Sequence, residues 1–382
     1  MLESGVELTI VPPLRDLGDG FKVRRALPSV DKRTVGPFVF FDQFGPAQFS
    51  AGRGLDVRPH PHIGLATVTY LFDGEILHRD SLGTEQRIRP GAMNWMTAGR
   101  GIVHSERTAA DVRQQAGSLS GLQCWVALPK SHEEDEPAFS HTSAAELPLI
   151  EGDGISARLI TGEMFGHRSP VKTLSPMIFV EIRLQPGSRL PISADYTERA
   201  LYPVDGAIDL EGEGVFEAGR MVILKPGATL ICRCAGSHAV TLALIGGEPL
   251  DGPRYVSWNF VSSSRERILR AAEDWRLQKF PSVPHESEFI PLPPNFRAPV
   301  DYPCLTSGNK NSLASICRTG ALDVHSGASG NSADFSWAIY TDPACIPSKG
   351  QFADLQETRR RGCGNCGCYR HTTATSAWPI SE

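Results

Sequence analysis

Two pairs of potential metal ligands, each separated by one residue, constrain this chain more than any other feature. The first pair is His60 and His62, and the second is His104 and Glu106. Because side chains alternate between the two faces of a β-strand, residues at positions i and i+2 point the same way. Two such strands side by side in a barrel would bring three imidazoles and one carboxylate to a common point. That donor set suits a divalent transition metal such as iron.

A simpler interpretation treats these histidines as ordinary core or surface residues that bind nothing. The metal interpretation is favoured because both pairs fit one geometry at the same time. A structural zinc site is a further alternative. Structural zinc usually takes four ligands in a closed and Cys-rich arrangement, and this ligand set contains no Cys.

The residues around the first pair match the opening of a known motif. Gly54, five residues, His60, one residue and His62 reproduce the start of the first motif of the cupin superfamily. That motif normally continues to a Glu and then, after six more residues, to a Gly. In this chain Gly74 occupies the Gly position and Thr67 the Glu position, so the expected carboxylate is missing from the first motif.

The second pair lies beside a match to the second cupin motif. Gly101 and His104, separated by two residues, resemble the core of that motif, and Glu106 follows two residues later. We therefore expect that the carboxylate missing from the first motif has moved to the second strand, where Glu106 supplies it.

Longer stretches around both pairs resemble one cupin family, the pirins. The resemblance covers about residues 6–293 and is strongest over 35–107. The stretches that carry it are 60–71 (HPHIGLATVTYL), 78–81 (HRDS) and 90–106 (PGAMNWMTAGRGIVHSE). Pirins are all-β proteins of two tandem cupin barrels, also called jelly rolls, with one iron held by three His and one Glu. The resemblance implies that fold here, with a few short helices.

The resemblance also implies a function. Some pirins are quercetinases, which open the central ring of flavonols with O2 and release carbon monoxide. The implied ligands of one Fe(II) are His60, His62, His104 and Glu106, and Glu106 could also accept a substrate proton as a general base. Other pirins are protein-interaction partners, including transcription cofactors, in which the redox state of the iron alters the binding surface. A metal-dependent enzyme acting on another small phenol or enol is a third alternative.

Composition and charge narrow the class of protein. A chain of 382 residues is long enough for two or three domains, and 41% hydrophobic residues can fill their cores. The counts of Gly (37) and Pro (29) favour turns and short strands over long helices. A net charge of -5 offers no overall basic surface for nucleic acid. Without a long apolar run or a signal-peptide pattern, we expect a cytoplasmic protein that does not span a membrane.

Short strands separated by Gly, Pro and Asp predict two tandem barrels. We predict a first barrel with the metal site over residues 1–130 and a second barrel over 131–294. The second contains no His-x-His sequence, so we expect it to bind no metal. Residues 130–150 are acidic and rich in Ser, Ala and Pro, and include the run 133–136 (EEDE). We interpret them as a solvated connection, with a docking segment as the alternative.

One amphipathic helix is expected over about residues 265–279. Ser263 and Glu266 match a capping box at its start. The apolar residues predicted to share one face are Ile268, Leu269, Ala272 and Trp275. We expect this face to pack onto a barrel, with binding to a partner as the alternative.

Residues 295–382 differ in composition from the rest. They hold six of the nine Cys and many Ser, Gly and Thr, with little apolar periodicity. Cys363 and Cys366 form one CxxC pair, but no second pair matches it. A zinc site is therefore less well supported than a Cys-rich tail of low order.

Overall fold

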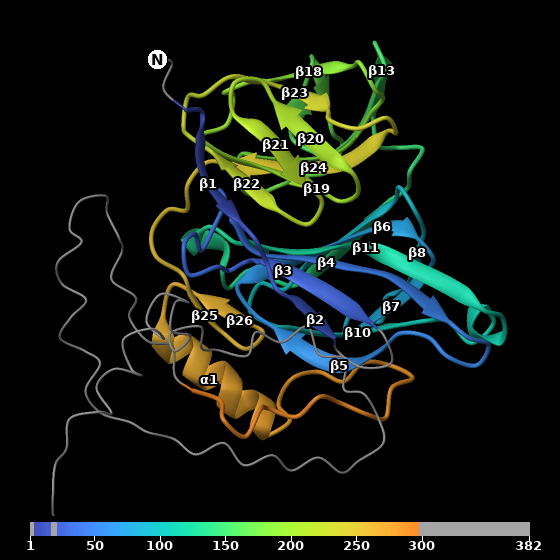
Figure 1. Ribbon diagram of the computed structural model, residues 1–382. Helices are drawn as coiled ribbons and strands as arrows, with labels where there is room; N and C mark the ends of the chain where they lie inside the picture. The colour runs from blue at the N-terminus through green and yellow to red at the C-terminus, as the bar shows by residue number, and fades with distance from the viewer. Residues whose placement is uncertain (1–3, 17–20, 298–382) are drawn as a thin grey trace, which may run out of the picture. The chain divides into compact units, whose positions relative to one another are not determined.

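The computed structural model describes residues 4–16 and 21–297 (Figure 1). All of them belong to one compact unit. Antiparallel strands, most of them in two barrels, are the predominant secondary structure of this part of the chain, so the all-β prediction is confirmed. The tail of low order predicted for 295–382 falls outside the described residues, apart from 295–297, and stays a prediction.

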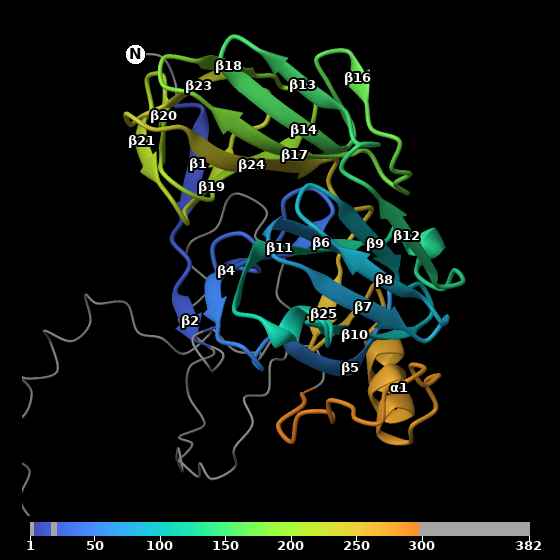
Figure 2. The same ribbon diagram turned by 90° about the vertical axis from the view of Figure 1, so that its right-hand side faces the viewer.

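The first barrel consists of a seven-stranded and a four-stranded sheet (Figures 1 and 2). The larger sheet has the order β12 (Ala138–Thr142), β9 (Met93–Thr97), β6 (Leu65–Asp73), β11 (Gly117–Ala127), β4 (Phe38–Phe49), β3 (Lys22–Leu27) and β2 (Leu14–Asp16). The smaller sheet has the order β5 (Asp56–His62), β10 (Ile102–Arg107), β7 (Ile76–Asp80) and β8 (Glu85–Ile88). A tight turn joins β6 to β7, and Gly74 there has a φ of 85°, which glycine adopts without strain.

The second barrel repeats this arrangement. Its larger sheet has the order β1 (Val6–Ile10), β22 (Met221–Leu224), β19 (Glu198–Pro203), β24 (Val240–Gly247), β17 (Met177–Leu184), β14 (Ile155–Thr161) and β13 (Leu149–Gly152). Its smaller sheet has the order β18 (Arg189–Ile192), β23 (Leu230–Cys234), β20 (Ala207–Leu210) and β21 (Gly214–Glu217). The remaining elements are the hairpins β15 (Glu163–Met164) with β16 (His167–Arg168) and β25 (Tyr255–Ser257) with β26 (Phe260–Ser262), the short 3-10 helices Val112–Gln114 and Lys130–His132, and the helix α1 (Arg265–Arg276).

Two strands pair with the barrel on the other side of the predicted boundary at residue 130. Strand β1, at the beginning of the chain, pairs with β22 of the second barrel, as Figure 1 shows. Strand β12, beyond residue 130, pairs with β9 of the first barrel. Nothing in the local sequence of either strand specifies which barrel it joins. The predicted domain boundaries themselves remain a prediction.

Strand β6 shows how alternation divides the core. Leu65 and Leu71 belong to the apolar cluster inside the first barrel. Ala66, Val68 and Tyr70 point to the opposite face and join a cluster that includes residues of the second barrel. Because both faces of this strand are covered, its residues are nearly all buried.

The interior of the second barrel is almost entirely aliphatic. Its buried cluster contains side chains such as Val180, Ile182, Leu201 and Leu242, with Cys232 as its buried sulfur-containing member. The prediction that this barrel binds no metal stays a prediction.

Helix α1 begins one residue later than the capping-box pattern predicts. The structure places Ser264, not Ser263, at the N-cap, where its hydroxyl accepts a hydrogen bond from the backbone N–H of Arg267 at 3.2 Å. Ser263 is instead held by Glu133, whose carboxylate accepts hydrogen bonds from its backbone N–H and its hydroxyl. A long-range contact therefore decided which of two adjacent serines caps the helix.

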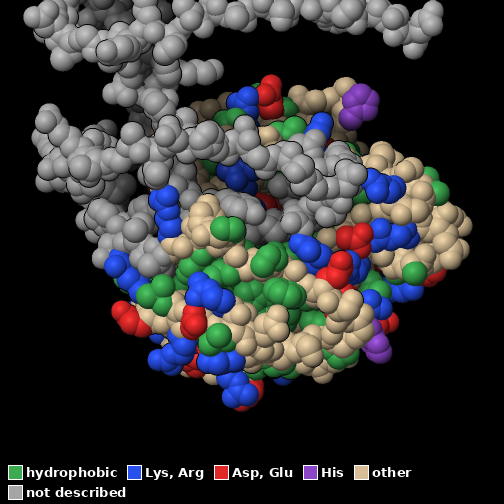
Figure 3. Space-filling view, turned by 90° about the horizontal axis from the view of Figure 1, so that it is seen from below, with side chains coloured by type: hydrophobic (Ala, Val, Ile, Leu, Met, Phe, Trp, Pro, Cys, Tyr) green, Lys and Arg blue, Asp and Glu red, His purple; other side chains and the backbone are tan. Residues whose placement is uncertain are grey.

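The predicted packing of α1 onto a barrel is confirmed. Ile268 and Trp275 are buried in the cluster of the first barrel, and the β25–β26 hairpin lies between the helix and that barrel (Figure 1). Leu269, predicted on the buried face, is instead 45% exposed, while Ala271 is buried. Seen from the side of α1, the surface mixes hydrophobic side chains with Lys and Arg (Figure 3). No helix of the described residues is long and apolar enough to cross a membrane.

The acidic stretch 133–136 is only partly a solvated connection. Glu133 is buried and forms an ion pair of 2.7 Å with Arg254 in addition to its bonds to the serines before α1. The exposed Glu134 pairs with Arg267 at 2.6 Å. Glu133 and Glu134 therefore bind the connection between the barrels to α1 and to the residues before it. The solvated interpretation was wrong for Glu133.

Candidate metal centre

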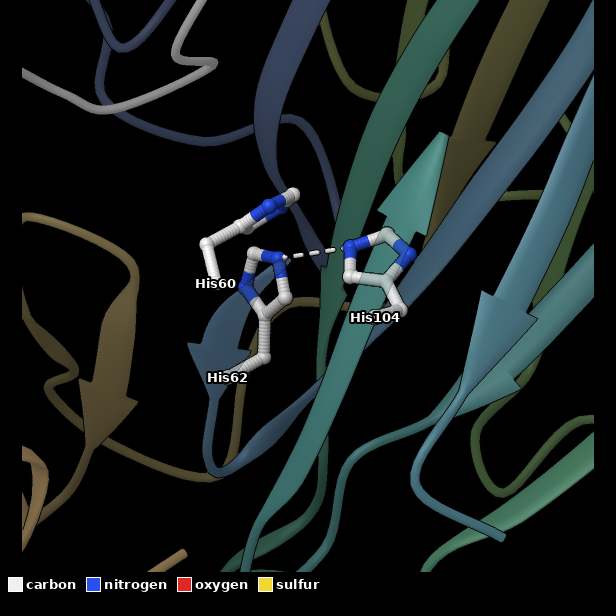
Figure 4. Close-up of side chains that lie close together, drawn as sticks. All are labelled: His60, His62 and His104. Atoms are coloured by element: carbon white, nitrogen blue, oxygen red, sulfur yellow. Dashed lines mark hydrogen bonds between the residues drawn. The ribbon is translucent and has the colours of Figure 1, made fainter. Parts of the chain in front are cut away.

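Strands β5 and β10 bring three of the predicted ligands together. They pair antiparallel, with His104 opposite His60 and Ile102 opposite His62. The three imidazoles are buried, and one ring nitrogen from each lies within 4.8 Å of the others. Figure 4 shows the rings facing one another from the two strands. Among the described residues, no other group of three or more His, Cys, Asp or Glu is arranged in this way.

Hydrogen bonds fix which ring nitrogen of His60 and of His62 faces the centre. Nδ1 of His60 lies 2.8 Å from the backbone oxygen of Arg58, and Nδ1 of His62 lies 3.1 Å from that of Asn259. A carbonyl oxygen can only accept, so both rings carry their proton on Nδ1. Their Nε2 atoms are left with lone pairs, and that of His60 has no hydrogen-bond partner in the described part of the chain.

Burial keeps the three rings neutral. Loss of hydration lowers the pKa of His60 to about 4, against a smaller upward effect of its bond to Arg58. Burial, reinforced by the neighbouring imidazoles, places the pKa values of His62 and His104 well below the usual range. Neutral imidazole is the form that binds metals, so the donors are ready without a proton being removed.

The distance between two of these nitrogens supports a cation at the centre. Nε2 of His62 and Nε2 of His104 are 3.1 Å apart (Figure 4). A hydrogen bond between them needs one ring to carry a proton on Nε2. For His62, which already donates from Nδ1, this would mean an imidazolium, and burial opposes that charge. The three rings can instead share a metal ion through their lone pairs, and Nε2 of His60 has no other partner in the described part of the chain, so the residues present fit a metal.

Glu106 is near the imidazoles in sequence, but its carboxylate is not among the atoms that lie within 4.8 Å of one another. The side chain is buried, and its Oε1 accepts a hydrogen bond of 3.1 Å from the Thr69 hydroxyl of β6. The pairing of β5 with β10 shifts between His104 and Glu106, where Arg58 and Pro59 lie opposite the single residue Ser105. Such a bulge changes the direction of nearby side chains, which a spacing rule does not predict.

The sequence analysis missed two residues beside this cluster, His78 and Asp80. Both are buried on β7, which pairs with β10 on the side away from β5. Nδ1 of His78 is 3.4 Å from Nδ1 of His104. The signal was present, because His78 and Asp80 have the same i and i+2 spacing as the ligand pairs.

Aromatic side chains form a wall on one side of the cluster. The ring of Trp125 lies 5.1 Å from that of His62 and stacks on Phe40 at 4.2 Å. Other aromatic residues near the motifs, such as Phe41, Tyr70 and Trp95, belong instead to the cluster that continues into the second barrel. The pair of Trp125 and Phe40 therefore lies directly against one of the candidate ligands.

The segment after α1 holds the outer side of both ligand strands. The backbone N–H of Ile290 donates to the oxygen of Pro59 at 2.8 Å. The Ser105 hydroxyl donates to Glu286 at 2.8 Å, and Arg107 forms an ion pair of 2.7 Å with the same carboxylate. Because Pro59 and Ser105 adjoin His60 and His104 in the chain, these bonds restrict the strands that position the imidazoles.

The metal-free protein is expected to lose stability on acidification, partly because of His60. Its pKa is about 4 in the folded chain and 6.5 when unperturbed, so the unfolded chain takes up a proton first as the pH falls. The free energy of unfolding should therefore decrease between about pH 6.5 and 4, by roughly 3 kcal/mol from this residue. Urea unfolding of metal-stripped wild type and His60→Gln across this range measures it. Equal pH slopes in the two proteins would contradict the expectation.

Comparisons with known proteins agree with the fold and the motifs. Residues 20–126 match the family model for Pirin, and 179–281 match that for the Pirin C-terminal cupin domain. A pirin-like protein of Caulobacter vibrioides is 47% identical over 293 residues, covering 75% of this chain and 99% of the relative. Human pirin is 30% identical over 280 residues, covering 72% and 93%.

Solved structures give the same result. A crystal structure of quercetin 2,3-dioxygenase from Acinetobacter baumannii matches with a TM-score of 0.69 and 33% identity, covering 76% of this chain and 97% of that one. The predicted architecture of two cupin barrels is therefore confirmed. With both barrels matched by family models and a relative that is nearly half identical, the chain belongs to the pirin family.

Proposed function

We propose that the protein is a metal-dependent dioxygenase that acts on a flavonol such as quercetin at the first barrel. The observation that carries this proposal is the convergence of three buried, neutral imidazoles on one point. The similarity to a quercetin 2,3-dioxygenase of known structure supports the choice of substrate class. Fe(II) is the proposed metal and the cytoplasm the proposed location.

In this proposal His60, His62 and His104 hold the metal through Nε2, and Glu106 completes the set. A donor set of imidazoles and a carboxylate would suit a divalent transition metal such as iron, as in non-haem iron oxygenases. When bound, the metal supplies Lewis-acid and redox chemistry toward an oxygen-donor substrate.

Glu106 has a second proposed role as the general base. The flavonol 3-hydroxyl loses a proton on activation, and the Glu106 carboxylate is the acidic group on the ligand strand that can take it. Thr69 donates a hydrogen bond to one carboxylate oxygen and so orients the side chain. Rotation about the side-chain torsions of Glu106 would move the carboxylate between Thr69 and the metal.

The stacked pair of Phe40 and Trp125 has a proposed role in excluding water. Both rings are fully buried, and Trp125 lies against the ring of His62. Exclusion of water strengthens the interaction between the imidazoles and a cation, since the local dielectric is low. An environment without water also suits an aromatic substrate that carries few charges.

The proposal is tested by loading the purified protein with Fe(II) and measuring oxygen uptake and carbon monoxide release with quercetin. We expect both in a fixed ratio, and neither with metal-stripped protein. If metal-loaded protein consumes no oxygen with any flavonol tested, the catalytic proposal fails. The iron-binding interaction module, which needs metal but no turnover, then becomes the better interpretation.

A further inference from the structure

A chain of three buried side chains runs from the candidate centre to the turn after β7. Nδ1 of His104 lies 3.4 Å from Nδ1 of His78, and Nε2 of His78 lies 3.1 Å from the Asp80 carboxylate. His78 is 3% exposed and Asp80 is fully buried. The strand pairing sets this contact, since β7 places Asp80 opposite His104.

The donor and acceptor roles of Asp80, His78 and His104 follow from the protons that each side chain carries. An ionised carboxylate only accepts, so His78 must donate to Asp80 from Nε2. In a neutral His78 ring the Nδ1 atom then presents a lone pair, to which His104 donates from its own Nδ1. The Nε2 atom of His104 is therefore left with its lone pair toward His62, 3.1 Å away.

Asp80 itself is firmly held. Its Oδ1 accepts hydrogen bonds from the backbone N–H groups of Leu82 at 2.9 Å and Thr84 at 3.1 Å. Burial alone would raise the pKa of Asp80, but the bond from His78 and these two amides outweigh it and hold the pKa below its usual value. The ring of Phe139 stacks on His78 at 4.5 Å and fixes its plane.

His104 differs from the other two imidazoles in what sets its tautomer. His60 and His62 each donate to a backbone oxygen, which no substitution of the acceptor side chain can remove. The corresponding partner of His104 is the side chain of His78, oriented by Asp80. Two residues outside the ligand set thus determine whether the third nitrogen donor is available.

We propose that Asp80, acting through His78, is a positioning residue that keeps His104 in its metal-binding tautomer. The inference rests on the metal centre proposed above but does not depend on flavonol oxidation. Partners of this kind typically change metal affinity by about 10–100-fold when they are removed.

Asp80→Asn is the decisive variant because it reverses the direction of the hydrogen bonds to His78 and His104 while preserving the shape of the side chain. The amide oxygen can still accept from Leu82 and Thr84, so the amide nitrogen faces His78 and donates to its Nε2. His78 then carries its proton on Nδ1 and donates to His104, whose proton moves to Nε2 and blocks the metal. Replacing an Asp by Asn beside a histidine has this effect on the tautomer in the serine protease triad.

The test measures the affinity for Co(II) by competition with a chelator, together with the visible spectrum of the bound ion. We expect Asp80→Asn to bind about 10–100-fold more weakly than wild type and to show a spectrum with one imidazole fewer. His78→Phe removes the acceptor but leaves His104 free to choose its tautomer. It should lose less affinity than Asp80→Asn, although it changes the packing more.

Asp42→Asn is the matched control. Asp42 is a fully buried carboxylate of the same barrel, but its ion pair of 2.8 Å is with Arg25. This variant should be less stable and yet keep the wild-type affinity for Co(II). Affinity in Asp80→Asn within about twofold of wild type, or a loss no greater than in Asp42→Asn, would overturn the proposal. If Asp80→Asn does not fold, wild-type affinity in His78→Phe overturns it instead.

These outcomes are distinguishable from failure of the proposed function. A wild-type protein that binds no Co(II) defeats the metal centre and the inference together. A wild-type protein that binds metal but does not oxidise flavonols defeats the enzymatic proposal alone, and the order of affinities among the variants still decides the role of Asp80.

Discussion

His62→Ala and His104→Ala are each expected to lose nearly all bound metal. Each substitution removes one of the three converging imidazole donors. Loss of a hydrogen-bond partner of a ligand typically lowers metal affinity about 10–100-fold. Loss of a ligand itself should lower it further, by at least about a hundredfold. Elemental analysis of the purified variants measures the metal per chain, which we expect to be one in the wild type and close to zero in the variants.

His141→Ala is the appropriate control for these two variants. His141 is on β12 of the same barrel, and its Nδ1 contacts Asn94 at 2.7 Å, not a candidate ligand. His78 would be an unsuitable control, because its Nδ1 lies 3.4 Å from Nδ1 of His104. Wild-type metal content in both ligand variants would show that the imidazole cluster is not the metal site.

Glu106→Gln is expected to separate metal binding from turnover. Gln keeps the shape and an oxygen that can accept from Thr69 or bind the metal, but it loses the negative charge and most of the basicity. Metal content should fall only partly, while turnover of quercetin per bound metal should fall by about tenfold or more, since general-base assistance contributes about 10²–10⁴-fold. Oxygen uptake normalised to metal content measures this ratio.

Glu133→Gln provides the comparison for Glu106→Gln. Glu133 is also a buried glutamate, but it pairs with Arg254 and the serines before α1. Its substitution should lower stability without changing turnover per bound metal. If Glu106→Gln likewise leaves turnover per metal unchanged, Glu106 acts at most as a ligand and the general-base role is wrong.

The period of two along a strand is a local property, and it predicted which candidate ligands share a face of their strand. His60 and His62 share a face because a single residue separates them in β5, and His104 lies opposite His60 in the neighbouring strand. The many glycines and prolines likewise predicted short strands and turns, which the two barrels confirm. The longer stretches around the two pairs also indicated the family, because their residues resemble those of pirins.

Local patterns in α1 did not decide which serine caps the helix or how deeply each residue of its apolar face is buried. Ser263 and Ser264 are both capable of capping α1, and the choice follows from the bonds between Ser263 and Glu133. Leu269 satisfies the helical period but lies at the edge of the contact with the barrel, where it stays 45% exposed. Both differences arise from contacts with distant parts of the chain.

The sequence by itself determined which face of each strand carries the candidate ligands, whereas the tertiary structure decided what those ligands meet. A bulge at Arg58 and Pro59 shifts β5 against β10, and the Glu106 carboxylate lies against Thr69 and outside the group of converging donor atoms. The pairing of β7 with β10 brings His78 and Asp80 to His104. Spacing along one chain fixes only the side of a strand, because the register between strands depends on turns, bulges and packing far away in sequence.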